Sequence, residues 1–459
     1  MKRKEAIVFT ALLLFSILPN LLIVCMAEDV ATIGQRLWYI ATTLALYGFG
    51  LALFHRRAYL YIISLGFFSS AFEIFHVCLR HTTTSLLYLY MWLKTPPKVI
   101  AQMAWEHIGW IIIGVILWIG FYVVAHHWVK REWIGSWRWR IPCAIVCAVF
   151  FFFSPMSVCP TNILTQLSHI TAMAVQVEKS IPEQRTFTYN ITPNTNKAEE
   201  TVIVVLSETS YEQWQSIAYR DSLAICFNSI YASCPASGVS MPLSLSRATA
   251  DDKAPFFVER SIIRAFDEAG FYTAWLSNYG YHDHFLMRIA DDCRYLTYRP
   301  DEPDTVLLTS FNEVMHQPSQ RHMVVLATRG GKNKDFVQST TCLLRQLTDS
   351  LGTTHQPAIL LYAGFPNIHL TDNQSELHMP LMIWTNPNYR YRHRSLIRTL
   401  NEQQNQRLSA DYIFHTLLYM NNIQCVQWEE RLSLGNQRMA PCDTIRYLDE
   451  NLNIQEFIP

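Results

Sequence analysis

Apolar residues are concentrated in the first third of the chain. Five long apolar runs fall within residues 1–160, at about 6–26, 37–54, 58–79, 108–125 and 141–159. Each run has roughly the 17–25 residues that an α-helix needs to cross the hydrocarbon core of a bilayer. The pattern therefore predicts an N-terminal transmembrane domain of five helices over residues 1–160.

A different pattern begins after residue 160. Residues 161–200 combine a segment of helical spacing with a polar, turn-rich stretch, which predicts a connector helix and linker. From residue 201 onward, short apolar and β-branched runs alternate with segments of helical spacing. The predicted strands lie at 201–206, 271–278, 322–328, 357–363 and 379–385, and the predicted helices lie at 261–269, 304–316, 336–351 and 408–422. This alternation predicts a doubly wound α/β domain over residues 201–459.

Charged residues add an orientation to this picture. Basic residues cluster before the first apolar run, between the second and third, and between the fourth and fifth, whereas Glu28 and Asp29 follow the first run. By the positive-inside rule the N-terminus is cytoplasmic, and five spans then place residues 160–459 outside the cytoplasm. The chain has 37 basic and 37 acidic side chains, which argues against a nucleic-acid-binding protein that neutralises phosphates.

The chain contains 11 cysteines, and none of them forms a C-x-x-C pair with zinc-finger spacing. Six cysteines lie beyond residue 200, where an oxidising compartment would allow disulfides. We expect Cys234 to pair with Cys293 and Cys425 to pair with Cys442. The alternative is that all six remain free thiols.

Two residues near the first predicted strand of the α/β domain are candidates for chemistry. Glu208 directly follows the strand, and the carboxyl ends of strands are where ligands bind in open α/β sheets. Its carboxylate is either a metal ligand or a solvated loop residue. Ser237 lies in a turn-rich stretch before a segment of helical spacing. A serine there is either a nucleophile that a metal and a helix N-terminus activate, or an ordinary turn or cap residue.

Several sequence motifs carry a resemblance to a known family. The strand runs into Ser207-Glu208-Thr209, and Ser237 follows about thirty residues later. The phrases AGFYTAWLSN at 269–278 and SADYIFHTLLYMNN at 409–422 match family motifs in the same order. The chain resembles the phosphoethanolamine transferases of bacterial envelopes, which are sulfatase-like members of the alkaline phosphatase superfamily.

The resemblance implies a multi-pass protein of the bacterial inner membrane with a sulfatase-like domain in the periplasm. It implies zinc as cofactor with Glu208 as a ligand, and Ser237 as the residue that becomes phosphoethanolaminated. Thr95 matches a residue that holds the ethanolamine headgroup, and His378 lies in a matching His-x-Pro segment. The implied partners are membrane lipids, with phosphatidylethanolamine as donor, and lipopolysaccharide or another envelope glycan as acceptor.

The chain departs from the family at most of its metal ligands. Phe365 and Pro366 stand where the family has Asp and His, and Lys332 stands where it has a further His. Phe and Pro cannot ligate zinc, which needs three or four ligands. His369 or Asp372 could substitute only if the loop were rearranged. Lys332 could still bind a phosphate group as a point charge.

Three hypotheses about function follow. The first is a catalytically impaired relative, a pseudoenzyme that binds phosphate-bearing lipid or glycan, and the missing ligands favour it. The second is an active phosphoethanolamine transferase with a rearranged site and Ser237 as nucleophile. The third is a membrane transport protein with an accessory domain. Whether the chain is an enzyme therefore depends on the site that the fold builds around Glu208.

Overall fold

The computed structural model describes residues 7, 21, 24–26, 33–61, 97–106, 108–132, 136–152, 171, 174, 175, 177, 179, 180, 182–191, 199–217, 219–279, 284–300, 302–319, 321–330, 335–367, 374–449 and 452–459. The chain divides into two compact units, Met1–Ala174 and Val175–Pro459. The second unit includes part of the predicted connector, because Tyr189 is only 1% exposed and belongs to its hydrophobic core.

Most described residues of the first unit are helical. Its helices are α2 (Ile33–Leu53), α5 (Pro97–Glu106), α6 (Ile108–Trp128) and α7 (Trp137–Phe152). Helices α2, α6 and α7 overlap three of the predicted spans, while most of 6–26 and 58–79 lies outside the described residues. Within the described part, α6 is the one helix long and apolar enough to cross a membrane. Five spans therefore remain a prediction.

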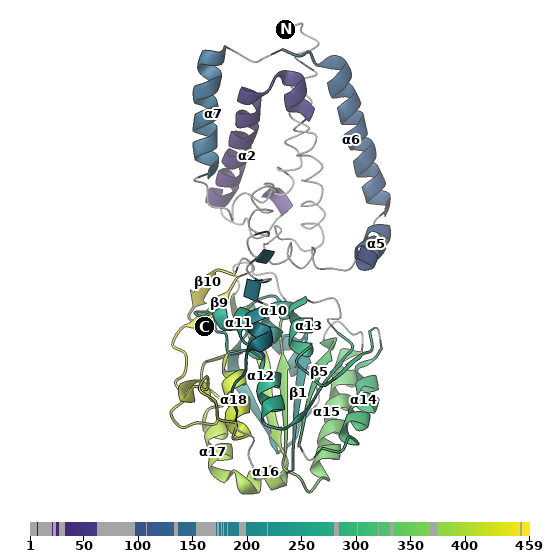
Figure 1. Ribbon diagram of the computed structural model, residues 1–459, viewed down its shortest axis with the longest axis vertical. Helices are drawn as coiled ribbons and strands as arrows, with labels where there is room; N and C mark the ends of the chain where they lie inside the picture. Colours follow the sequence, from purple (N-terminus) through teal and green to yellow (C-terminus); the bar gives the residue numbers. More distant parts are fainter. Residues whose placement is uncertain are drawn as a thin grey trace. The chain divides into compact units, whose positions relative to one another are not determined.

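The second unit is built on a mixed sheet of eight strands (Figure 1). The strand order is β4-β3-β5-β1-β6-β7-β2-β8. The eight strands are β1 (Glu200–Ser207), β2 (Ala224–Tyr231), β3 (Tyr272–Ser277), β4 (Tyr295–Tyr298), β5 (Arg321–Thr328), β6 (Ala358–Gly364), β7 (His378–Thr385) and β8 (Leu408–Ser409). A separate antiparallel pair is formed by β9 (Ile445–Leu448) and β10 (Ile454–Phe457).

Most neighbouring strands are parallel, but β7 runs antiparallel to both β6 and β2. A parallel connection needs a long crossover, usually a helix. Between β6 and β7 the described chain contains only the 3-10 turn η4 (Gln374–Leu377). The predicted doubly wound sheet therefore contains one strand, β7, that runs against its neighbours.

Helices cover both faces of the sheet, as predicted for a doubly wound domain (Figure 1). They are α9 (Tyr211–Gln215), α10 (Ser237–Ser244), α11 (Ala254–Val258), α12 (Ile262–Glu268), α13 (His284–Ala290), α14 (Leu307–Met315), α15 (Phe336–Gly352), α16 (Pro387–Arg392), α17 (Arg394–Glu402) and α18 (Tyr412–Met420). Two further 3-10 turns are η2 (Asp304–Val306) and η5 (Glu430–Leu432).

The central strand β1 shows why the fold forms. Val202, Val204 and Leu206 pack into one hydrophobic cluster, while Ile203 and Val205 pack into the other. Successive side chains of a strand point to opposite faces, so an unbroken apolar run fits a strand that is covered on both sides. The predicted strand at 201–206 is confirmed, and it is buried on both faces.

Two sequence-based expectations are wrong. The predicted helix at 408–422 begins instead as strand β8, which pairs with the end of β2, and becomes helical only at Tyr412. The expected disulfides, Cys234 with Cys293 and Cys425 with Cys442, are not formed in the structure. Burial raises the pKa of Cys293 and Cys425, which disfavours the thiolate that disulfide chemistry needs.

Candidate functional site

Glu208 lies at the carboxyl end of β1, in the middle of the sheet. The backbone on both sides of it is fixed to the end of β6. Phe365 N donates to Ser207 O at 2.8 Å, and Thr209 N donates to Phe365 O at 3.0 Å. Glu208 is only 6% exposed. The carboxylate is therefore held at the carboxyl end of the central strand, where the sequence predicts a ligand site.

Three side chains donate hydrogen bonds to the Glu208 carboxylate. Ser237 Oγ donates to Oε2 at 3.2 Å, and the hydroxyl of Tyr279 donates to the same oxygen. Asn367 Nδ2 donates to Oε1 at 2.9 Å. The two hydroxyls are also 3.2 Å from each other. Hydroxyl and amide donors thus occupy both carboxylate oxygens, which is how a buried charge is stabilised.

The predicted pair of Glu208 and Ser237 is brought together by the turn before α10. Ser237 is the first residue of that helix and is 1% exposed. The turn is anchored by Ser233, whose hydroxyl donates to the carboxylate of Asp411. Burial raises the pKa of Asp411 to about 6, while hydrogen bonds from Ser233 and Ser409 act in the opposite direction. Ser237 is therefore positioned by the folded core.

Tyr279 and Asn367 were not identified from the sequence. Tyr279 follows the strand β3, and its backbone is fixed because Tyr279 N donates to Ser277 Oγ at 3.0 Å. Asn367 follows Phe365 and Pro366 at the end of β6. The sequence signal for both residues was their position shortly after a predicted strand. Asn367 follows β6, which neighbours β1, and Tyr279 follows β3, which is separated from β1 by β5.

Of the other predicted site residues, His378 is the one that the structure describes, and its hydrogen bond goes to the backbone of Asn228. His378, at the start of β7, is bonded through Nε2 to Asn228 O at 2.9 Å. Its ring stacks on Tyr211 with centroids 3.7 Å apart, and burial lowers its pKa. Thr95 and Lys332 lie outside the described residues, as do His369 and Asp372.

Zinc, which the sequence resemblance implies, does not fit the described residues at this site. Phe365 is fully buried and packs in the hydrophobic core, so no ligand comes from that position. Asn367 offers an amide, which donates to Glu208. In the described ranges, no three His, Cys, Asp or Glu side chains lie close enough to share a metal ion. Zinc in proteins is usually held by three or four His, Cys or carboxylate ligands.

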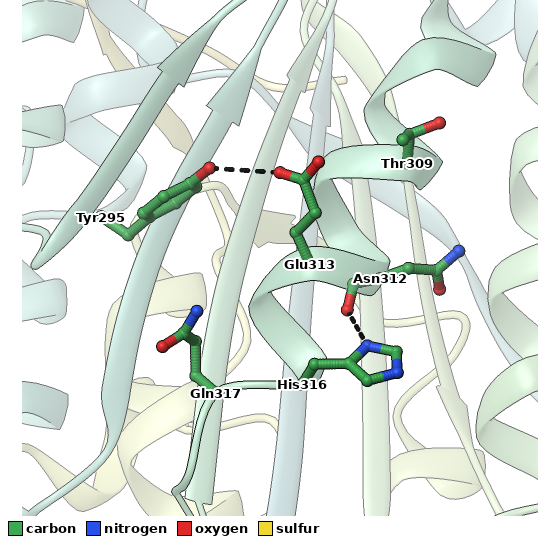
Figure 2. A pocket seen from close by; sticks show the side chains of 6 residues that line it. All are labelled: Tyr295, Thr309, Asn312, Glu313, His316 and Gln317. Atoms are coloured by element: carbon green, nitrogen blue, oxygen red, sulfur yellow. Dashed lines mark hydrogen bonds between the residues drawn. The ribbon is translucent and has the colours of Figure 1, made fainter.

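A separate cavity of about 710 Å³ lies between β4 and α14 (Figure 2). It is lined by Tyr295, Thr309, Asn312, Glu313, His316 and Gln317. The strand pairings place Tyr295 level with Ile203 of β1, three strands away. Strand spacing and rise then put it roughly 20 Å from Glu208. This cavity is therefore not part of the Glu208 site.

Among the comparisons with known proteins, the search of solved structures supports the fold. No protein-family profile matches the chain, and no curated protein sequence matches it. The integral membrane protein lipooligosaccharide phosphoethanolamine transferase A (EptA) from Neisseria meningitidis is 14% identical, with a TM-score of 0.61. The match covers 82% of this chain and 86% of EptA, so it extends beyond the second unit.

Two solved domains give lower TM-scores. The C-terminal periplasmic domain of phosphoethanolamine transferase EptC from Campylobacter jejuni is 17% identical, covers 55% of this chain and 99% of its own, and has a TM-score of 0.45. The zinc complex of the corresponding EptC domain from Escherichia coli is 14% identical, covers 55% and 91%, and has a TM-score of 0.47. At 14% identity, the likeness to EptA concerns the fold. The chain has the sulfatase-like fold of the membrane-bound phosphoethanolamine transferases.

Proposed function

We propose that this chain is a membrane-anchored relative of the phosphoethanolamine transferases that binds phosphate-bearing lipid or glycan headgroups without transferring them. The observation that carries the proposal is the burial of Ser237 beside Glu208, at a site where no three His, Cys, Asp or Glu side chains of the described residues lie close enough to hold an activating metal ion. A phosphoryl transfer requires the nucleophile to reach the phosphorus atom and to be activated. Ser237 is 1% exposed, and its hydroxyl is already bonded to Glu208 and close to Tyr279.

The same site has features that suit a phosphate group. Ser237 begins α10, and the residue before it, Ala236, provides no side-chain cap for the first backbone amides. Such amides and the helix dipole favour an anion. Lys332, predicted to bind phosphate as a point charge, follows Gly330 closely in the chain. Binding would require the pair of Glu208 and Ser237 to open, which costs the hydrogen bond between them.

We further propose the topology that the sequence predicts. The N-terminus lies in the cytoplasm, five helices cross the inner membrane, and the second unit lies in the periplasm. The integral membrane nature of EptA and the periplasmic location given for the EptC domains support this arrangement. A reporter enzyme fused after residue 459 and active only outside the cytoplasm is expected. Activity in the cytoplasm would contradict the orientation.

Intact-mass spectrometry tests the absence of transfer. The full chain, purified from its native membrane, should carry no phosphoethanolamine increment. The Ser237→Ala variant should have the same mass apart from the substitution, with Ser240→Ala as a control buried in the same helix. A phosphoethanolamine group on the peptide that contains Ser237, absent in Ser237→Ala but present in Ser240→Ala, would establish the active transferase instead.

A thermal unfolding series tests binding. Added O-phosphoethanolamine should raise the unfolding temperature of the full chain, because a ligand that binds only the folded state stabilises it. Ethanolamine lacks the phosphate and should leave the temperature unchanged. Equal shifts with both compounds, or no shift with either, would contradict binding through phosphate.

A further inference from the structure

A strongly basic segment lies beyond the amino ends of β1 and β6, whereas Glu208 lies at the carboxyl end of β1. Four arginines and no acidic residue occur between Glu376 and Glu402, in a chain whose formal net charge is zero. The arginines lie on α16 and α17, which are joined at His393. We call the exposed side chains of Tyr391, Arg392, Arg394 and Arg398 the arginine surface.

The strand pairings fix where the arginine surface lies. Asn386, which begins α16, donates from its backbone to Ala358 O at the amino end of β6. Thr201 of β1 pairs with Ala358, seven residues before Glu208. At about 3.3 Å per residue this separation is roughly 20 Å. The arginine surface is therefore distinct from the Glu208 site.

The backbone that carries the arginine surface is held firmly. The Asn386 side chain caps α16 by accepting from Tyr389 N at 2.9 Å, and it also donates to Gln356 O at 2.7 Å. Tyr389 is fully buried and donates its hydroxyl to Met420 O at 2.6 Å. Arginines on such a frame lose less entropy when they bind than arginines on a free loop.

Two of the arginines are available for a ligand. Arg392 and Arg394 are exposed, and neither forms an ion pair with any residue in the described ranges. Arg394 lies over the ring of Tyr391, 4.8 Å from its centroid, and Tyr391 is 73% exposed. Arg398 is exposed, and its ion pair among the described residues is with Glu402, four residues further along the same helix.

We propose that the arginine surface binds a glycan that carries phosphate groups. The planar guanidinium group donates paired hydrogen bonds that match phosphate oxygens. The exposed Tyr391 ring offers an apolar face against which a sugar ring can pack. The proposal goes beyond the Glu208 site, and only the choice of phosphate as the charged group rests on the proposed function.

A membrane surface is the less suitable partner. A helix that binds at a bilayer interface inserts an apolar face between the lipid headgroups. In α17 the apolar side chains Leu396, Ile397 and Leu400 are buried against the domain. Tyr391 is left as the large apolar side chain of the arginine surface that faces solvent.

Binding of the full chain in detergent to immobilised yeast phosphomannan tests the proposal. Wild-type protein should bind phosphomannan at least about tenfold more tightly than dephosphorylated mannan, and binding should weaken as salt rises. The double variant Arg392→Glu/Arg394→Glu should lose that preference. Arg392→Lys/Arg394→Lys keeps the charge without the guanidinium fork and should lose part of it.

Arg431→Glu/Arg438→Glu is the matched control. It reverses two exposed arginines that pair with Glu429 and Glu430, elsewhere in the unit. This control should bind phosphomannan as the wild type does. Glu208→Gln should also retain binding, which separates this proposal from the proposed function. Equal binding to both mannans, unchanged binding by the Arg392→Glu/Arg394→Glu variant, or binding only to phosphatidylglycerol vesicles would overturn it.

Discussion

The hydroxyl of Tyr279 is the part of the Glu208 site whose removal tests the site most cleanly. Tyr279→Phe deletes one oxygen and keeps the ring. In the wild type that hydroxyl donates to Glu208 Oε2 and lies 3.2 Å from Ser237 Oγ. The change therefore removes one of the three donors that the described residues provide to a carboxylate that is only 6% exposed.

The expected loss of stability follows from the charge of the acceptor. A hydrogen bond to a charged group contributes roughly 1.5–3 kcal/mol, against about 1 kcal/mol for a neutral pair. Water cannot readily replace the donor, because Glu208 is buried. For a unit of this size, each kcal/mol shifts the unfolding temperature by roughly 2 °C. We therefore expect Tyr279→Phe to lower the unfolding temperature of the second unit by about 3–6 °C.

The assay is thermal unfolding of the full chain in detergent, followed by fluorescence of the buried Trp275 and Trp384. Tyr295→Phe is the matched control, since it deletes a hydroxyl that is 3.5 Å from the exposed Glu313 (Figure 2). The control should shift the temperature by less than about 1 °C. If the two variants unfold at the same temperature, the hydrogen-bonded carboxylate described here is wrong.

Two more predictions concern the same unit. Burial lowers the pKa of His415 to about 3, so between pH 6.5 and pH 3 the unfolded chain binds a proton that the folded chain does not, and stability falls as the pH drops. Unfolding midpoints should show a loss of roughly 2 kcal/mol from pH 7 to pH 5 that is missing in His415→Gln, and an identical pH dependence would contradict this. Gly330 has φ +53°, and a Cβ atom there would lie 2.3 Å from Ser207 Oγ and 2.6 Å from Glu208 O. Gly330→Ala should therefore lose about 2 kcal/mol or more, clearly exceeding Gly270→Ala, where a Cβ atom meets nothing within 4 Å; equal losses would contradict a close approach at Gly330.

The fold of the second unit could be predicted where local patterns and the final packing agree. The apolar run at 201–206 predicts a strand covered on both faces, and Gly270 after a helical pattern predicts the helix end found there, with φ +92°. The prediction fails at 408–409, where helical spacing continues into residues that pair with β2. Pairing with a distant strand is a tertiary effect that local spacing does not contain.

The site could be predicted only in part for the same reason. Glu208 and Ser237 stand out because each follows a strand or a turn in a recognisable motif, and the structure places them 3.2 Å apart. Tyr279 and Asn367 have no motif of their own. Their roles depend on β3 and β6 ending near β1, which is a property of strand order. All five membrane spans stay predictions from hydropathy, and α6 is the described helix that is long and apolar enough for one.

Metal analysis of the purified full chain tests the central claim most directly. Ser237, Tyr279 and Asn367 donate hydrogen bonds to the Glu208 carboxylate, and we infer that these bonds replace a metal ion. After dialysis against a weak chelator, the protein should retain far less than one zinc per chain, and Glu208→Gln should not change that amount. One tightly held zinc per chain in the wild type, lost in Glu208→Gln, would contradict the account.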